Sequence, residues 1–302
     1  PADGADLQPD IARDGDGTLW IAFTRWSSYD FCVDVCPESD ASVNDGVYVL
    51  SNAGGGWSAP ERVATSSMRA QIAVRSGRIH IVYEDDWATA GDDTSAIHHA
   101  TRATGTWTME HIGDGYGPSL ALDSNEKAHV AFHRSGRVYY AEPIGGGFEV
   151  MELSLADEAA WPRLSIDGAD RPHIVYTAWG SDAGSSVMHT TLSGGAWSEA
   201  TLIARDALVG QLAAESDGAV HVTYQISEGD EEEWQEQWYA TNRGGAFVTR
   251  RLIRGGLDLF GPGGSSALAI GHDGRAHVLF TALALDFGDD LSGLWYAIGP
   301  GR

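Results

Sequence analysis

The stretch Leu164–Ile203 reads LSIDGADRPHIVYTAWGSDAGSSVMHTTLSGGAWSEATLI and contains four short apolar runs separated by turns. An Asp-Gly turn follows the first run, and the second run, His173–Tyr176, is β-branched and aromatic. A polar loop separates it from the third run, and Gly194-Gly195 precedes the fourth. Short runs of this composition, bounded by Gly and Asp, are typical of strands joined by hairpins. The stretch therefore predicts a unit of four antiparallel strands.

The second run of this unit recurs six times along the chain. Its copies contain Trp20, His80, His129, His173, His221 and His277. Four strands in ~40–50 residues are typical of a propeller blade. The sequence thus predicts an all-β, six-bladed β-propeller of four-stranded blades, forming one domain over residues 1–302, with three strands in the last blade. The predicted blades are residues 9–63, 70–112, 118–153, 162–203, 210–253 and 266–298. The repeated histidines are expected to pack or hydrogen-bond within the blades.

The chain is strongly acidic, with a net charge of −24. This charge argues against a nucleic-acid partner, because binding a phosphate backbone requires a basic stripe. It favours cations, basic partners or simply solubility. No apolar run approaches the ~20 residues of a membrane span. The sequence begins inside a loop and contains no signal peptide, so we expect that a leader has been removed and that the protein is secreted, periplasmic or on the cell surface. A monomer is also expected.

Only two cysteines are present, Cys32 and Cys36. Two cysteines without further ligands make a poor zinc site. A disulfide that closes a long loop is favoured in an exported chain, with free thiols and a metal site as alternatives.

The long insertions all lie between the second and third strands of a blade or between blades. Up-and-down geometry places these loops on one face, and function in such scaffolds sits on loops. The sequence therefore predicts a site on the long-loop face, over the central channel. The insertions are residues 26–46, 84–95, 178–186, 226–236 and 282–293.

The first strand of each blade is expected to line that channel, with a polar residue near the mouth. The equivalent positions hold Asp10, Gln71, Ser119, Arg163, Gln211 and Ala267. Small residues follow two positions later, on the same strand face. This polar ring predicts either a pocket floor or a ring satisfied by water. If it is a floor, Gln71, Ser119 and Gln211 bind the ligand, while Asp10 and Arg163 face each other across the channel.

Aromatic residues in the loops are candidates for stacking against sugar rings. They are Trp26, Trp87, Trp161, Trp179 and Trp234, and the alternative is that they pack loops onto blades. One histidine, His133, has no equivalent in the other blades. With Tyr116, Arg163 and Asp10 it is a candidate for acid–base sugar chemistry. No cofactor is required, but carboxylates at Asp85, Asp86, Asp289 and Asp290 suit a calcium ion.

The repeated units resemble the sialidase-like, or BNR-type, propellers. The residues that carry this resemblance are the Asp/Gly turn and aromatic strand Asp14–Trp20 and the Gly-rich turns before Trp57, Trp107 and Trp197. The resemblance implies the propeller fold. It does not extend to sialidase activity, because the arginine triad and the Tyr/Glu pair of that family cannot be assembled here.

The sequence is therefore interpreted as an exported propeller that binds a glycan or another small ligand at the long-loop face. One alternative is a carbohydrate-active hydrolase or lyase with its site at the same place. Another is a protein-interaction scaffold whose acidic face meets a basic partner.

Overall fold

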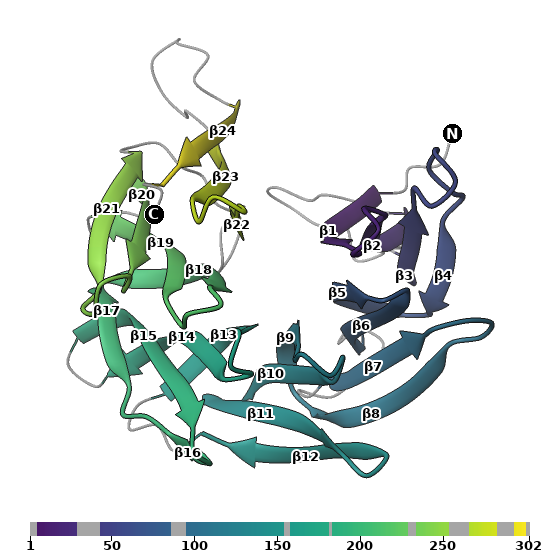
Figure 1. Cartoon of the computed structure of the whole chain (residues 1–302), viewed down its shortest axis with the longest axis horizontal. Coiled ribbons are helices and arrows are strands. Elements are labelled where there is room, and N and C mark those ends of the chain that lie inside the picture. The colour runs from purple at the N-terminus through teal and green to yellow at the C-terminus, as the bar shows by residue number, and fades with distance from the viewer. Residues whose placement is uncertain are drawn as a thin grey trace, which may run out of the picture. The chain divides into compact units, whose positions relative to one another are not determined.

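The computed structural model describes residues 5–28, 43–85, 95–153, 158–180, 183–228, 234–253, 266–282 and 293–299. The chain is all-β and forms six antiparallel sheets, which are the blades of a β-propeller (Figure 1). The predicted fold class is confirmed, including a sixth blade of three strands.

Contacts divide the chain into two compact units. The first unit, Pro1–Ser135 and Tyr140–Met151, contains blades 1 and 2 and most of blade 3. Blade 1 consists of β1 (Ala5–Arg13), β2 (Leu19–Ser28), β3 (Val43–Ser51) and β4 (Glu61–Ala64). Blade 2 consists of β5 (Ser67–Arg75), β6 (Arg78–Asp85), β7 (Ala96–Arg102) and β8 (Thr108–Asp114). Blade 3 consists of β9 (Tyr116–Leu122), β10 (Ala128–Arg134), β11 (Arg137–Ile144) and β12 (Gly147–Glu152).

The second unit, Gly136–Tyr139 and Glu152–Arg302, contains blades 4 to 6. Blade 4 consists of β13 (Glu158–Ile166), β14 (Pro172–Gly180), β15 (Ala183–Ser193) and an outer edge in two pieces, β16 (Ala196–Trp197) and β17 (Thr201–Arg205). Blade 5 consists of β18 (Ala207–Ala214), β19 (Val220–Glu228), β20 (Trp234–Thr241) and β21 (Val248–Ile253). Blade 6 consists of β22 (Ser266–Ile270), β23 (Ala276–Ala282) and β24 (Gly293–Ile298).

The second strands of blades 2, 3 and 4 are buried on both faces over most of their length, because blades stack face to face. In β6 the residues from Ile79 to Glu84 are all buried. Ile81 and Tyr83 belong to an apolar cluster that blade 2 shares with Val47 and Val49 of blade 1. A continuous run of Ile, Val and Tyr therefore suits these strands better than strict alternation would.

The repeated histidines join the second strand of a blade to the third, as predicted from the sequence. His80 Nδ1 lies 3.0 Å from His99 Nε2, and His173 Nδ1 lies 3.2 Å from His189 Nε2. In blades 3, 5 and 6 the partner is a tyrosine hydroxyl, that of Tyr140, Tyr239 and Tyr296 respectively. Burial lowers the pKa of His80 to about 3 and the pKa of His189 to about 4. Burial therefore favours the neutral form of His80 and His189, and both act as structural groups of the core.

The innermost strands of blades 1 to 5 begin earlier than predicted. The start of β1 is Ala5 and not Pro9, and β5, β9, β13 and β18 also begin before the predicted boundaries. The cause is a β-bulge, which interrupts the alternating pattern without ending the strand. In blade 1 the register shifts between Leu7 and Asp10, so Gln8 and Pro9 form the bulge. Proline is tolerated there because a bulge leaves a residue unpaired.

Candidate functional site

A bulge recurs in the innermost strands of blades 1 to 5. In blades 1 to 4 the first residue of the bulge has positive φ: +53° at Gln8, +51° at Arg69, +58° at Gly117 and +52° at Trp161. A positive φ costs little at glycine but strains other residues, and such strain clusters at functional sites. Bulges also redirect side chains near active sites. The bulged ends of the inner strands are therefore the candidate position for a functional site.

The residues paired just before each bulge differ in character among the blades. Blades 1 and 4 pair an aliphatic residue with a buried threonine: Leu7 with Thr24, and Ala160 with Thr177. Blade 2 pairs Met68 with Glu84, and blade 3 pairs Tyr116 with His133. Groups able to transfer protons or carry charge thus replace the ordinary residues in two neighbouring blades of the first unit.

Tyr116 and His133 lie together, as the sequence prediction of a shared site requires. Their ring centroids are 6.0 Å apart, with the planes tilted by 40°. Gly115 permits this close approach of β9 to β10, because a Cβ atom there would lie 2.8 Å from the carbonyl oxygen of His133. The pair thus brings a phenol and an imidazole, two groups able to transfer protons, side by side on neighbouring strands.

Glu84 connects this pair to blade 2. Its side chain has no exposed surface, and Oε1 accepts a hydrogen bond from Arg69 Nη1 at 2.8 Å. The other oxygen, Oε2, accepts from the backbone N–H of Gly117 at 2.6 Å. Both oxygens of a buried carboxylate are thereby satisfied, which removes most of the cost of burying its charge. The ion pair between Arg69 and Glu84 was not predicted from the sequence, although both residues depart from their equivalents in other blades.

The predicted floor residues contact the neighbouring blade. Asp10 Oδ2 accepts from the N–H of Ile72 at 2.8 Å, and Gln71 Oε1 accepts from the N–H of Leu120 at 2.9 Å. In blade 4, Arg163 Nε donates to the carbonyl of Gly210 at 2.9 Å. These contacts join inner strands to one another. The part of these residues in ligand binding stays a prediction.

Register confirms most of the predicted alignment of the floor. Asp10, Gln71, Ser119, Arg163 and Ala267 pair respectively with Ala22, Val82, Ala131, Val175 and Leu279, all at the same position of the second strand. Gln211 differs, because the bulge of blade 5 occupies Gly210 and Gln211 itself. Its N–H donates to Thr223 Oγ1 at 2.8 Å. The residues that follow keep the common register, since Leu212 pairs with Val222 and Ala213 with His221, so only the bulge of blade 5 is displaced, by one residue along the strand.

The predicted aromatic residues that the structure describes belong to different units. Trp161 and Trp179 meet edge to face, 5.1 Å between ring centroids, in the second unit. Trp26 lies in β2, opposite Ala5 and Asn44. Asp10 and Arg163 also belong to different units. The prediction that they face each other stays a prediction, as does a role for Arg163 beside Tyr116 and His133.

Several predicted residues lie outside the described part of the chain. They are Cys32, Cys36, Asp86, Trp87, Asp289, Asp290 and the side chain of Trp234. Of the proposed calcium ligands, only Asp85 is described, and its Oδ2 lies 3.2 Å from His98 Nε2. Among the described residues, no group of three or more His, Cys, Asp or Glu is placed to hold a metal ion. The calcium site, the disulfide and export stay predictions.

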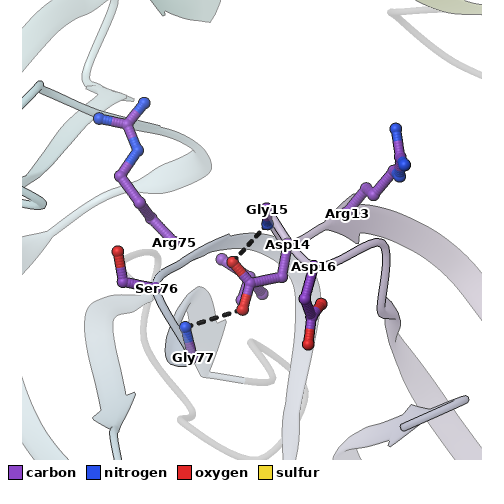
Figure 2. A pocket seen from close by; sticks show the side chains of 8 residues that line it. Arg13, Asp14, Gly15, Asp16, Arg75, Ser76 and Gly77 are labelled. Carbon is purple, nitrogen blue, oxygen red and sulfur yellow. Dashed lines mark hydrogen bonds between the residues drawn. The ribbon is translucent and has the colours of Figure 1, made fainter.

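At the opposite end of the strands, the first turns of blades 1 and 2 enclose a pocket of about 510 Å³ (Figure 2). Asp14 crosses between the turns: Oδ1 accepts from the N–H of Gly15 at 2.6 Å and Oδ2 accepts from the N–H of Gly77 at 2.7 Å. The Asp14–Gly17 turn is thus a hairpin turn, as predicted, and its carboxylate joins two blades.

No protein-family model matches the sequence, and no curated protein sequence matches it. Solved structures are similar in fold. An ulvan lyase, described as a new family of polysaccharide lyase and bound to -[GlcA(1-4)Rha3S]-, aligns with a TM-score of 0.61 and 14% identity over 98% of this chain and 82% of that one. The α-L-arabinanase of Penicillium chrysogenum, complexed with arabinobiose, aligns with a TM-score of 0.58 and 12% identity over 99% and 95%.

An α-L-arabinofuranosidase of Fusarium graminearum in complex with an iminosugar inhibitor aligns with a TM-score of 0.54 and 12% identity, over 97% of this chain and 92% of that chain. At these identities the likeness establishes the propeller fold and leaves the activity to be argued from the residues. The resemblance to sialidase-like propellers in particular stays a prediction. In the described part of the chain, no helix is long and apolar enough to cross a bilayer.

Proposed function

We propose that this propeller binds a glycan at the bulged ends of blades 2 and 3. The observation that carries the proposal is the pairing of Tyr116 with His133, next to the bridge from Glu84 to Gly117. Aromatic and hydrogen-bonding groups on rigid strand ends suit a sugar, whose rings have apolar faces and hydroxyl rims. The carbohydrate-active enzymes among the similar folds support the same ligand class.

Catalysis is the second candidate function, and the Tyr116–His133 pair favours it. Glycoside hydrolases ordinarily use two carboxylic groups. Beside the Tyr116–His133 pair, the carboxylate of Glu84 is buried with both oxygens hydrogen-bonded. A phenol and an imidazole suit a lyase better, because an elimination requires one proton acceptor and one proton donor.

In such an elimination on a uronate, His133 would remove the proton from the carbon beside the carboxyl group. The electron pair left behind forms a C=C bond. The neighbouring glycosidic C–O bond breaks, and its oxygen takes a proton from the hydroxyl of Tyr116. Atoms and charge balance without any oxidant or further reactant.

The test is to titrate the protein calorimetrically with neutral and acidic oligosaccharides, and to follow ultraviolet absorbance of unsaturated products. Tyr116→Phe and His133→Gln should each retain the fold. If the protein is a lyase, each should lower turnover by roughly a hundredfold or more, the usual contribution of a general acid or base. If it only binds, each should weaken affinity without any turnover in the wild type.

The matched control is His111→Gln, which changes an exposed histidine on the outer strand β8. It should leave binding and turnover unchanged. Wild-type behaviour of both the Tyr116 and the His133 variants would place the site elsewhere, and the absence of any glycan binding would refute the proposal.

A further inference from the structure

We propose that Arg69 makes this site selective for glycans that carry an anionic group, a carboxylate or a sulfate ester. The inference rests on the proposed function and narrows its ligand class. It is argued from the way the arginine is held, from the departure of blade 2 from the repeat, and from the charge of the chain.

Hydrogen bonds hold the backbone and one guanidinium nitrogen of Arg69, while part of the side chain is exposed to solvent. Its backbone N–H donates to Gln8 Oε1 at 3.2 Å, and Nη1 donates to the buried carboxylate of Glu84 at 2.8 Å. The arginine side chain is nevertheless 46% exposed, whereas Glu84 is 0% exposed. Within the described part of the chain, Nε and Nη2 make no hydrogen bond. The guanidinium is therefore oriented by a buried partner while two of its nitrogens remain available to a ligand.

The backbone at Arg69 is strained, with φ at +51°. The equivalent residue of blade 3 is Gly117, which adopts a similar φ of +58° without this strain. A left-handed conformation costs a non-glycine residue roughly 1–2 kcal/mol. Gln8 and Trp161 adopt the same conformation in blades 1 and 4, so the strain belongs to the repeated bulge. Blade 2 differs from these blades in placing a cation at this position.

Glu84 departs from the repeat in a related way. Its counterpart in blade 4, Thr177, uses its hydroxyl to accept a hydrogen bond from the N–H of Val209 in the next blade, at 3.1 Å. Glu84 makes the same kind of bond to Gly117 and has a second oxygen left over, which holds Arg69. A threonine would be enough to join the blades. The extra length and charge of Glu84 serve the arginine.

The negative charge of the whole chain also favours a role for Arg69 in binding an anion. A protein with a net charge of −24 repels anions at long range, so it needs a local cation to hold an acidic sugar. The guanidinium fork matches the geometry of a carboxylate or sulfate. Glu84 links Arg69 to Gly117, the residue after Tyr116, so an anion on Arg69 would lie beside the Tyr116–His133 pair.

The experiment uses paired probes that differ only in charge. Uronate oligosaccharides are compared with their methyl esters, and sulfated galactan oligosaccharides with their desulfated forms, by titration calorimetry. The wild type should bind at least one acidic probe roughly tenfold to a hundredfold more tightly than its neutral partner, the range expected for a charge-assisted hydrogen bond. Which pair shows the difference identifies the anion as carboxylate or sulfate.

Two variants locate the selectivity. Arg69→Gly gives blade 2 the bulge residue of blade 3, and the double variant Arg69→Gly/Glu84→Thr also restores the threonine of blade 4, so that no buried carboxylate is left half-satisfied. Both should bind acidic and neutral probes alike. Arg78→Ala removes the same charge from the far end of the same hairpin, and it should keep the preference.

Neutral binding that equals acidic binding in the wild type, or a preference that survives in the double variant, would overturn the assignment of Arg69. Either result would leave the proposed glycan site intact, since neutral probes would still bind and still depend on Tyr116. Failure of every probe to bind would instead overturn the proposed function and this inference with it.

Discussion

Buried histidines are the residues through which acid should act on this fold. In blade 2, burial lowers the pKa of both His80 and His99, the first to about 3. The unfolded chain protonates these groups near the ordinary histidine pKa of 6.5, so it binds more protons than the folded chain between about pH 6.5 and pH 3. The stabilisation is fully present above pH 6.5 and is lost as the pH falls through that window.

We expect His99→Tyr to reduce this acid sensitivity. Tyrosine is the partner that blades 3 and 5 already use, and its hydroxyl can donate to His80 Nδ1 without titrating in this range. The slope of the free energy of unfolding between pH 6.5 and pH 4 should fall by up to about 1.4 kcal/mol per pH unit, the value for one proton. Denaturant unfolding across that range measures it. His111→Tyr, at an exposed histidine, should not change the slope, and an unchanged slope in the His99 variant would contradict the account.

Among single residues, the Tyr116–His133 pair could be predicted from the sequence because no other blade has an equivalent of His133. The sequence could not predict that Arg69 pairs with Glu84, or that Glu84 bonds to Gly117. Arg69 hides inside a strand whose bulge shifts the alignment, and the hydrogen bonds of Glu84 span two blades. Contacts between segments that are distant in sequence leave no short-range sequence pattern, so only the folded structure reveals them.

Among the elements, the bulges explain both the success and the failure of the sequence analysis. Strand order and the six anchors followed from alternation and turn residues. The first two to four residues of the inner strands were missed in blades 1 to 5. In four of these blades the residue at the predicted boundary, Pro9, Pro118, Pro162 or Gly210, is typical of a break in a strand. A bulge uses such residues inside a strand, so the pattern cannot distinguish it from a loop.

A glycine in β3 gives a sharp test of this element-level packing. Gly46 has φ at +109°, and a Cβ there would lie 2.8 Å from the carbonyl carbon of Ala64 and closer still to its oxygen. Gly46→Ala should lower the free energy of unfolding by about 3 kcal/mol or more, because a backbone clash cannot be relieved by rotating a side chain. Chemical denaturation measures the loss.

The matched control is Gly55→Ala, where φ is +83° but no atom lies within 4 Å of the added Cβ. Only the conformational cost of about 1–2 kcal/mol should appear there. Equal losses in the two variants would show that the clash at Gly46 is absorbed by movement of the strand.

For the whole molecule, the charge of −24 should make stability depend on salt. Self-repulsion destabilises a compact, highly charged state, and screening at about 0.15 M ionic strength shortens its range to ~8 Å. The melting temperature should therefore rise as sodium chloride is added from low concentration. A non-ionic osmolyte at matched osmolality is the control, because it lowers the activity of water without screening charges. A melting temperature that falls with salt would mean that attractive ion pairs outweigh the repulsion.

The hydrogen bonds that join a side chain of one blade to the backbone of another share a common arrangement along the chain. The side chain belongs to the earlier blade and the backbone group to the later one, as in Asp10 with Ile72, Gln71 with Leu120, Glu84 with Gly117, Thr177 with Val209, and Ser165 with Ala214. A chain leaving the ribosome would thus present each finished blade as a template for the next, and the newcomer is recognised by amide groups that nearly every residue carries. A gene that duplicates one blade would produce a copy already able to dock, with its own side chains left free to diverge.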